Sequence, residues 1–363
     1  MSNVFSSQFD YQPPGAIYLD SPANGVMSNT TFDAGRVSDQ RGKDDVSEYR
    51  MHFLMNEMKE LRSSLAAQLS IAPSSLALMS SFSVALNYLI TGLDQRWRVW
   101  SLEGDYPSLI MPFELYAFDL TKAPIPTLEL STARILESIE ASKPDLVVLS
   151  HVQWLSGFKV ELQELGAFCR ERGIFTLIDG TQHVGVEPLD LRSLKVDAYG
   201  ASGCKWLLAG FGNGFQYIDP SFFEQLSIRT GGFGSMLNFE NEWKYTESMK
   251  NFEPGHLDHI AFVRMKNAVH EWAENDPGQI SSFIGLQTNH LLDELKSNGV
   301  DVYDFRAVNG MSSIVSLGLS DDQINKLKTE GIRFSKRGGR VRIGCHIYNS
   351  RKQLEAFVNT ITS

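Results

Sequence analysis

Two short apolar runs joined by one amphipathic segment constrain the fold of this chain more than any other feature. Residues 145–152 (DLVVLSHV) and 174–180 (IFTLIDG) are each long enough for one buried strand. Between them, residues 160–173 (VELQELGAFCRERG) carry apolar side chains at helical spacing and end in a glycine that suits a helix C-cap. Strands that are apolar throughout and linked by a helix are typical of a parallel sheet, so the stretch predicts an α/β fold.

The segments around this unit extend the predicted sheet. Residues 96–104 (RWRVWSLEG) and 197–203 (DAYGASG) have the composition of further strands. Ligands of such sheets bind outside the carboxyl ends of the strands. The polar side chains that fall at these predicted ends are Glu103, His151, Asp179 and Ser202. Beyond Glu253, long helical patterns and short strand-like runs predict a smaller α+β domain.

Composition narrows the classes of partner. The 363 residues include 33 basic and 43 acidic side chains, a net charge of −10, so no basic face is expected for nucleic acid or an anionic membrane. The N-terminus lacks the pattern of a signal peptide, and no segment approaches 18 uninterrupted apolar residues, which predicts a cytoplasmic protein. The three scattered cysteines and eight histidines form no CxxC or HExxH pattern, so neither a disulfide framework nor a metal site is expected.

Residues 201–215 (ASGCKWLLAGFGNGF) are compatible with three chemistries. The glycines resemble a dinucleotide loop, but they run into a strand-like segment rather than a helix, which leaves a nicotinamide dehydrogenase only as an alternative. Cys204 lacks a neighbouring base and is interpreted more simply as a packing residue. Lys205 lies among apolar residues that would remove water from its ammonium group and lower its pKa. It is therefore either a Schiff-base former or a lysine whose stem is buried while its ammonium reaches water.

Asp179 favours the covalent role for Lys205. A carboxylate at the end of a buried strand is costly without a partner. Pyridoxal 5'-phosphate (PLP) needs an amine for its aldehyde and an anion for its ring nitrogen, and Lys205 and Asp179 would supply both. The alternative is that Asp179 caps the following turn, which is common for Asp-Gly.

From Tyr18 to the C-terminus the chain resembles the aminotransferase class-V family of fold-type I PLP-dependent enzymes, which includes cysteine desulfurases, kynureninases and isopenicillin N epimerase. Residues 179–207 (DGTQHVGVEPLDLRSLKVDAYGASGCKWL) carry the resemblance. It implies a large PLP-binding domain over residues 17–260, with a mostly parallel, seven-stranded-type sheet between helices. Residues 261–363, with the N-terminal arm 1–16, would form the small C-terminal α+β domain.

The resemblance also implies roles for individual residues. Lys205 would bind the cofactor covalently, Asp179 would face the ring nitrogen, Gln182 the phenolic oxygen, and Ser202 the phosphate. The remaining cofactor contacts would be Ser81, Phe82 and Ser83 in a phosphate cup over residues 79–93, Tyr106 stacked on the ring, Gln153, Cys204, and His256 reaching the phosphate of a neighbouring subunit. The last of these implies a homodimer. Arg342 would bind the carboxylate of an amino-acid substrate, with Asn24 as a second substrate contact.

Ordinary structural roles remain open for several of these residues. Ser81 and Ser83 precede an apolar helix and could be N-caps. Tyr106 could be a core or surface tyrosine, and an arginine on a strand such as Arg342 is usually solvated. Residues 331–342 (GIRFSKRGGRVR) lack the cysteine that desulfurases carry before this arginine.

We therefore expect an enzyme that acts at the α-carbon of a small amino acid, as a transaminase or a C–S lyase. An epimerase resembling the isopenicillin N enzyme is the first alternative, and a cysteine desulfurase ranks below it. A non-catalytic homologue that keeps only the fold is the alternative from a different class.

Overall fold

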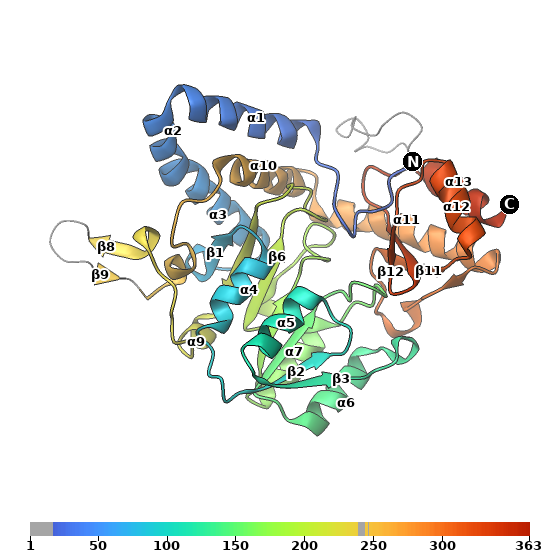
Figure 1. Ribbon diagram of the computed structural model, residues 1–363, viewed down its shortest axis with the longest axis horizontal. Helices are drawn as coiled ribbons and strands as arrows, with labels where there is room; N and C mark the ends of the chain where they lie inside the picture. The colour runs from blue at the N-terminus through green and yellow to red at the C-terminus, as the bar shows by residue number, and fades with distance from the viewer. Residues whose placement is uncertain (1–16, 239–243, 246) are drawn as a thin grey trace.

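The computed structural model describes residues 17–238, 244–245 and 247–363 of the chain, and its central feature is a seven-stranded sheet (Figure 1). In order across the sheet the strands are β1 (Leu76–Met79), β7 (Gly214–Ile218), β6 (Ala198–Ser202), β5 (Phe175–Asp179), β4 (Leu146–Ser150), β2 (Arg98–Leu102) and β3 (Asp119–Ala123). Strands β3, β2, β4, β5 and β6 are parallel, whereas β7 pairs antiparallel with both β6 and β1. The predicted α/β fold with a mostly parallel sheet is confirmed.

The strand directions bring distant parts of the chain to one edge of this sheet. The parallel strands β2, β4, β5 and β6 end at Leu102, Ser150, Asp179 and Ser202. Because β7 runs the opposite way, its first residue, Gly214, pairs with the last residue of β1, Met79. The helix that follows β1 therefore also begins at the carboxyl edge. The prediction that polar residues gather at this edge is confirmed.

Helices cover both faces of the large sheet and bury alternate residues of its strands. One face packs against α4 (Phe82–Ile90), α5 (Pro107–Leu115) and α9 (Pro220–Phe223). The other face packs against α3 (Met58–Gln68), α6 (Thr132–Ser142), α7 (Leu162–Glu171), α8 (Leu191–Leu194) and α10 (His259–Glu274). Helix α7 ends next to Gly173, whose φ of +66° is that of the predicted left-handed cap.

Apolar side chains recur at three- and four-residue steps over residues 44–69, which predicts one regular helix closed by Pro73. The observed N-terminal helices differ from this prediction. Helix α1 (Asn29–Asp44) begins at the N-cap Ser28 and packs against α10. The next helix runs from α2 (Val46–His52) through a π-helical turn (Phe53–Glu57) into α3. It ends at Gln68, because Ser70 takes a positive φ of 57°, and Pro73 opens a short 3₁₀ helix instead of closing the long one.

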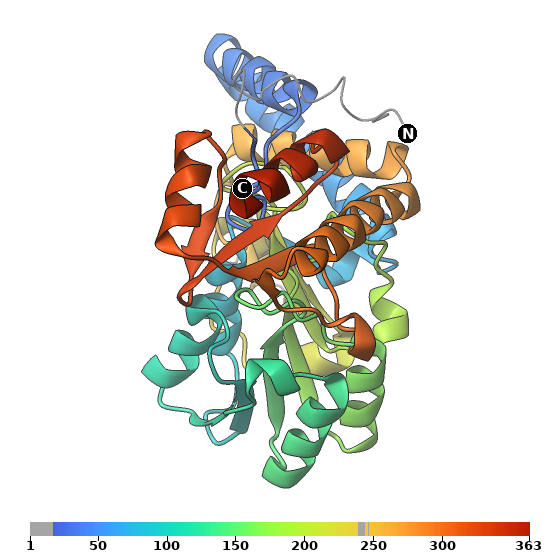
Figure 2. The ribbon, with the colours of Figure 1, turned by 90° about the vertical axis from the view of Figure 1, so that its right-hand side faces the viewer.

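A second, four-stranded antiparallel sheet forms the C-terminal part of the molecule. Its order is β10 (Asp301–Val302), β11 (Ile314–Gly318), β13 (Arg340–Gly344) and β12 (Ser335–Arg337). One face packs on α11 (Pro277–Ser297), α12 (Asp321–Thr329) and α13 (Arg351–Thr362). Figure 2 shows these orange and red elements gathered above the green strands and helices. The predicted α+β arrangement is therefore present.

The core passes from one sheet to the other inside α11. Ile280 and Ile284 pack in the core of the large sheet, whereas Leu291 and Leu295 pack in that of the small one. The domain boundary at residue 260 stays a prediction, and the N-terminal arm lies outside the described residues.

The remaining short elements are η4 (Thr127–Glu129), η5 (Phe233–Ser235), η6 (Met249–Phe252), η7 (Arg306–Val308) and a hairpin of β8 (Met236–Asn238) and β9 (Lys244–Tyr245). Among the described helices, none combines the length and the apolar character needed to cross a membrane.

Candidate active site

Lys205 lies in the turn that connects β6 to β7 at the carboxyl edge of the large sheet. The turn is closed by backbone hydrogen bonds from Gly203 to Asn213 and from Ala209 to Gly203. Positive φ angles at Gly210 and Gly212 carry the chain directly into β7. The strand predicted after these glycines is confirmed, and this geometry does not suit a dinucleotide loop, which must open a helix.

The amine of Lys205 lies near an aromatic ring and forms no ion pair with any residue that the structure describes. Its Nζ lies 5.2 Å from the centre of the Tyr106 ring and has no hydrogen-bond or salt-bridge partner among the described residues. Burial lowers the pKa of Lys205, and the nearby Asp179 and Cys204 only partly oppose this. A lysine with a lowered pKa is more often the neutral amine, which is the form that attacks a carbonyl carbon.

Asp179 ends strand β5, and its carboxylate is buried with 5% exposure. Its Oδ1 accepts a hydrogen bond of 2.8 Å from the backbone N–H of Thr181. Burial raises the pKa of Asp179 to about 6, while Lys205 lowers it and Asp105 raises it further. Asp179 and Lys205 are therefore close enough for each to influence the charge of the other.

Strand β1 leads into a helix N-terminus that faces the end of β6. Ser81 is the N-cap of α4, and its Oγ accepts the N–H of Val84. The N–H of Phe82 donates to Oγ of Ser202 at 3.0 Å, which joins the helix to the end of β6. The N–H and hydroxyl of Ser83 have no partner among the described residues. The side chain of Phe82 packs in the core, so only its backbone lies at this helix end.

Tyr106, Trp154 and Arg342 form the opposite wall. Tyr106 is the N-cap of α5, and its ring meets that of Trp154 edge-on at 5.5 Å. The carbonyl oxygen of Trp154 accepts a 2.8 Å hydrogen bond from Nη1 of Arg342. Arg342 lies on β13, only 3% exposed, and its Nε has no partner among the described residues. Burial lowers the pKa of Arg342 to about 10, although Asp20 partly compensates.

Two predicted contacts are already engaged within the protein. Gln182 donates from Nε2 to the Pro22 carbonyl at 2.9 Å and accepts from Nε1 of Trp206 at 2.7 Å. Gln153 donates to the Gly104 carbonyl and accepts the N–H groups of residues 155 and 156, so its amide shapes the loop after β4. The cofactor contacts expected of these two amides stay predictions.

The N-terminal segment places Asn24 beside the Lys205 turn. The N–H of Gly25 donates to the carbonyl of Cys204 at 2.9 Å. Oδ1 of Asn24 is buried without a hydrogen-bond partner among the described residues. Burial raises the pKa of the Cys204 thiol despite the nearby Lys205, which keeps the thiol protonated and argues against a nucleophilic cysteine.

His256 is the predicted site residue that this chain does not bring to Lys205. It is exposed, and its Nε2 lies 2.7 Å and 2.9 Å from two guanidinium nitrogens of Arg50 in α2. Among the described residues, none of its contacts is with the Lys205 cluster. Its expected role in a neighbouring subunit stays a prediction.

Three further residues of the site were not predicted from the sequence. Asp105 accepts hydrogen bonds from the Ser150 N–H and hydroxyl and from the N–H of Tyr106, so it holds the start of α5 against β4. Thr181 bridges Asp179 and Ser202. Asp20 has a buried Oδ1 without a partner among the described residues. A polar residue just after a strand was the available signal for Asp105, whereas Asp20 is far from Arg342 in sequence.

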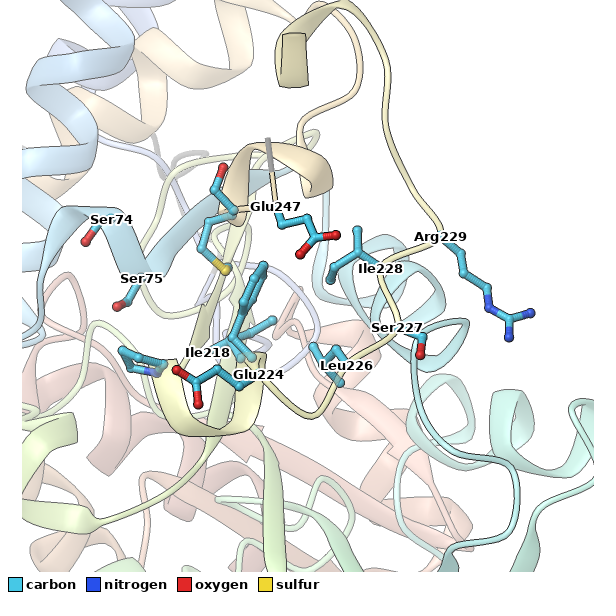
Figure 3. A pocket seen from close by; sticks show the side chains of 13 residues that line it. Ser74, Ser75, Ile218, Glu224, Leu226, Ser227, Ile228, Arg229 and Glu247 are labelled. Atoms are coloured by element: carbon cyan, nitrogen blue, oxygen red, sulfur yellow. The ribbon is translucent and has the colours of Figure 1, made fainter. Parts of the chain in front are cut away.

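An open hollow lies at the other edge of the sheet. It has a volume of about 900 Å³ and is lined by residues that include Ser75, Ile218, Glu224 and Glu247 (Figure 3). Ser75 precedes β1 and Ile218 ends the antiparallel β7, so the hollow lies at the amino ends of the parallel strands. Its lining contains none of the predicted site residues.

Comparison with known proteins points to one family. A family model described as aminotransferase class-V matches residues 17–357. Isopenicillin N epimerase of Streptomyces clavuligerus is 29% identical over 226 residues, which are 59% of this chain and 56% of that protein. The chain thus spans little more than half the length of this curated relative.

Solved structures agree in fold. A cystine C–S lyase, in a complex with its product cysteine persulfide, has a TM-score of 0.87 at 20% identity and covers 95% of this chain and 97% of its own. Cysteine desulfurase from Thermococcus onnurineus has a TM-score of 0.83 at 20% identity and covers 94% and 93%. At this identity the likeness establishes the fold alone.

Proposed function

The chain belongs to the aminotransferase class-V family of PLP-dependent enzymes, and from this premise we propose that it acts at the α-carbon of an amino acid as a transaminase or a C–S lyase. The observation that carries the proposal is the amine of Lys205, which has no ion-pair partner among the described residues and lies within electrostatic reach of the buried Asp179 and Arg342. Buried charged groups normally occur in pairs, so unpaired ones mark a place where a ligand completes the set.

The residues at this edge fit PLP. Lys205 supplies the amine for its aldehyde, and Asp179 is a buried anion for its ring nitrogen. The N–H and hydroxyl of Ser83, which have no partner among the described residues, lie at the N-terminus of α4 with the N-cap Ser81. Ser202 contacts this helix end from β6, and the arrangement suits the phosphate dianion. The other contacts proposed from the family are Phe82, Tyr106, Gln153, Gln182 and Cys204, with His256 from a second subunit. When bound, PLP supplies an electron sink that stabilises negative charge at the α-carbon.

The protein's own groups would then bind the substrate and move its proton. Arg342 would bind the substrate carboxylate through its fork of N–H donors, beside Asn24. The neutral amine of Lys205 would accept the α-proton and return it to another atom. The rings of Tyr106 and Trp154 would keep water away from the amine.

The cysteine positions argue against a desulfurase. The turn between β12 and β13, where that activity requires a cysteine, contains Gly338 and Gly339 instead. Cys169 and Cys345 are buried in the two cores. Cys204 is held as the thiol.

An epimerase is the second candidate, because isopenicillin N epimerase is among the relatives. In that case the α-proton would return to the opposite face of the α-carbon. We keep it second because, among the described residues, Lys205 is the one amine at the site.

An absorbance spectrum of the purified protein tests the premise. We expect a band at the edge of the visible range that is lost in Lys205→Ala. Single amino acids are then added, and keto acid, sulfide and inverted stereochemistry are assayed in parallel. A colourless protein that PLP cannot reconstitute would contradict the proposal, and formation of the mirror-image amino acid alone would replace the lead with the epimerase.

We also propose a homodimer, with α1 and α2 at its interface. Exposed apolar side chains gather on these helices and the π-helical turn: Phe32, Val37, Val46, Met51 and Met55. His256 lies on the same side, bound to Arg50. Light scattering should give twice the chain mass, and Met55→Glu should lower it towards one chain. A wild-type protein that is monomeric at assay concentration would contradict both the dimer and the role of His256.

A further inference from the structure

The small sheet has one apolar face and one basic face. Val315, Leu317, Val341 and Ile343 point to the helix-covered side and are buried. Residues between them point to the other side, where Arg342 pairs with Ser316 on one neighbouring strand and Ser335 on the other. Arg337 pairs with Arg340, two residues further along. Because strand side chains alternate between faces, Arg337, Arg340 and Arg342 share the basic face.

These three arginines differ in their partners. Nη1 of Arg340 lies 2.6 Å from the carboxylate of Asp301, and its guanidinium stacks over Tyr303 at 4.0 Å. Within the described ranges of the chain, the carbonyl of Trp154 is the one hydrogen-bond acceptor of Arg342. Arg337 is exposed and donates to the carbonyl of its neighbour Lys336 at 3.1 Å. Neither Arg342 nor Arg337 has an ion-pair partner in the described part of the chain, so both keep free donors.

The β12–β13 turn places Arg337 at the mouth of the site. Gly338 and Gly339 both have positive φ, and a Cβ at Gly338 would lie 3.6 Å from the side chain of Leu155. The turn therefore contacts the loop that carries Trp154. The positive charge of Arg337 also lowers the pKa of both Arg342 and Lys205, which puts its charge within reach of the reacting amine.

We propose that Arg337 binds a second anionic group of the substrate, so that the enzyme acts on amino acids with an acidic side chain. Arg337 and Arg342 are diagonal neighbours on adjacent strands, a relation that places two residues about 7–8 Å apart, with their Cβ atoms slightly closer. Two guanidinium groups at this spacing suit two carboxylates separated by a few bonds, as in a dicarboxylic amino acid.

Asp20 does not neutralise Arg337 or Arg342. The negative charge of its carboxylate raises the pKa of Arg342, and the charges of both arginines lower the pKa of Asp20. It forms no ion pair within 4 Å with either of them. Burial raises the pKa of Asp20, which further weakens it as a permanent partner.

The test compares binding of matched amino acids to the PLP-loaded enzyme. Glutamate and aspartate are titrated against glutamine and asparagine, with the change in cofactor absorbance as the readout and kcat/KM where turnover occurs. We expect the acidic member of a pair to bind at least about tenfold more tightly. Arg337→Gln should remove this preference and leave the amide members unchanged.

Lys336→Gln is the matched control, because it removes one positive charge from the same strand. Lys336 points to the other face of the sheet, where its Nζ lies 3.8 Å from a carboxylate oxygen of Asp321. The control should keep the preference. Equal binding of acid and amide by the wild type, a preference that survives Arg337→Gln, or an equal loss in both variants would overturn the proposal.

This inference rests on the proposed function, and the two can fail separately. If no amino acid alters the cofactor spectrum, the proposed function is wrong. The role of Arg337 is then tested with glutarate and butyrate, which carry two and one carboxylates and no amino group. The readout is the shift in melting temperature that each ligand causes in the wild type and in Arg337→Gln. A larger shift with glutarate in the wild type alone supports Arg337 as an anion-binding residue, and equal shifts overturn it.

Discussion

The amino and carboxyl edges of the large sheet differ in two respects: the hollow at the surface and the pairing of their polar groups. The amino edge has an open hollow of about 900 Å³, lined by apolar side chains, serines, Arg229 and the carboxylates of Glu224 and Glu247 (Figure 3). The carboxyl edge has groups without hydrogen-bond or ion-pair partners among the described residues: the partly buried amine of Lys205, and the buried Nε of Arg342 and Oδ1 of Asn24. A hollow open to water costs a folded chain little, whereas buried unpaired polar groups cost stability. The carboxyl edge is therefore where a ligand is expected.

The largest expected effect is at Lys205. Lys205→Ala should reduce turnover at least about a thousandfold, because it removes both the covalent attachment and the base. The variant should also lose the absorbance band while keeping its fold by circular dichroism. Turnover within tenfold of the wild type would show that the chemistry lies elsewhere.

The loss of stability caused by the buried Asp179 carboxylate can be measured without cofactor, which tests directly whether the carboxyl edge destabilises the fold. Since burial raises its pKa to about 6, the folded cofactor-free protein holds this proton more tightly than the unfolded chain does. The free energy of unfolding should therefore fall by about 3 kcal/mol from this group as the pH rises from about 3 to about 7, with most of the fall between about 4 and about 6.

Asp179→Asn should remove this loss, so the cofactor-free variant should be more stable than the wild type at pH 7, and about equally stable at pH 3. Urea unfolding of both proteins across this range measures the difference. With PLP bound, the variant should lose activity, because an amide cannot hold the ring proton. A variant that is less stable than the wild type at pH 7 would contradict the conclusion that the buried Asp179 carboxylate destabilises the cofactor-free protein.

Arg342 tests the opposite wall. Arg342→Gln should lower kcat/KM by ten- to a hundredfold, mainly through KM, because it removes the paired donors for the substrate carboxylate. Arg340→Gln is the control on the same strand, since Arg340 is already paired with Asp301. An equal loss in both variants would point to damage of the sheet instead of lost substrate binding.

The smallest effect is expected at the amino edge. The double change Glu224→Gln and Glu247→Gln should alter kcat/KM less than twofold and stability by less than about 0.5 kcal/mol, because both side chains border an open hollow. A loss of activity as large as that of Arg342→Gln would break the comparison between the two edges.

Local pattern was sufficient for much of the fold. The continuous apolar runs predicted β4 and β5, and the helix between them ends next to Gly173 as expected. The reversed direction of β7, which pairs antiparallel with both β6 and β1, was not predicted, since a short apolar run looks the same whichever way its strand is paired. The π-helical turn within residues 46–68 was also missed, because its side chains keep a helical spacing.

The amino-acid sequence by itself determined which groups could react. A lysine among apolar residues and an aspartate at the end of a buried strand follow from local spacing. The carboxyl ends of parallel strands lie at the same edge of a sheet, which places both residues there. Only the tertiary structure decided which charges remain unpaired. Arg342 approaches Trp154 across 188 positions, and Arg340 is paired with Asp301 while Arg337 is not. The physical reason is that pairing depends on distances between atoms of different elements, and spacing along the chain does not contain those distances.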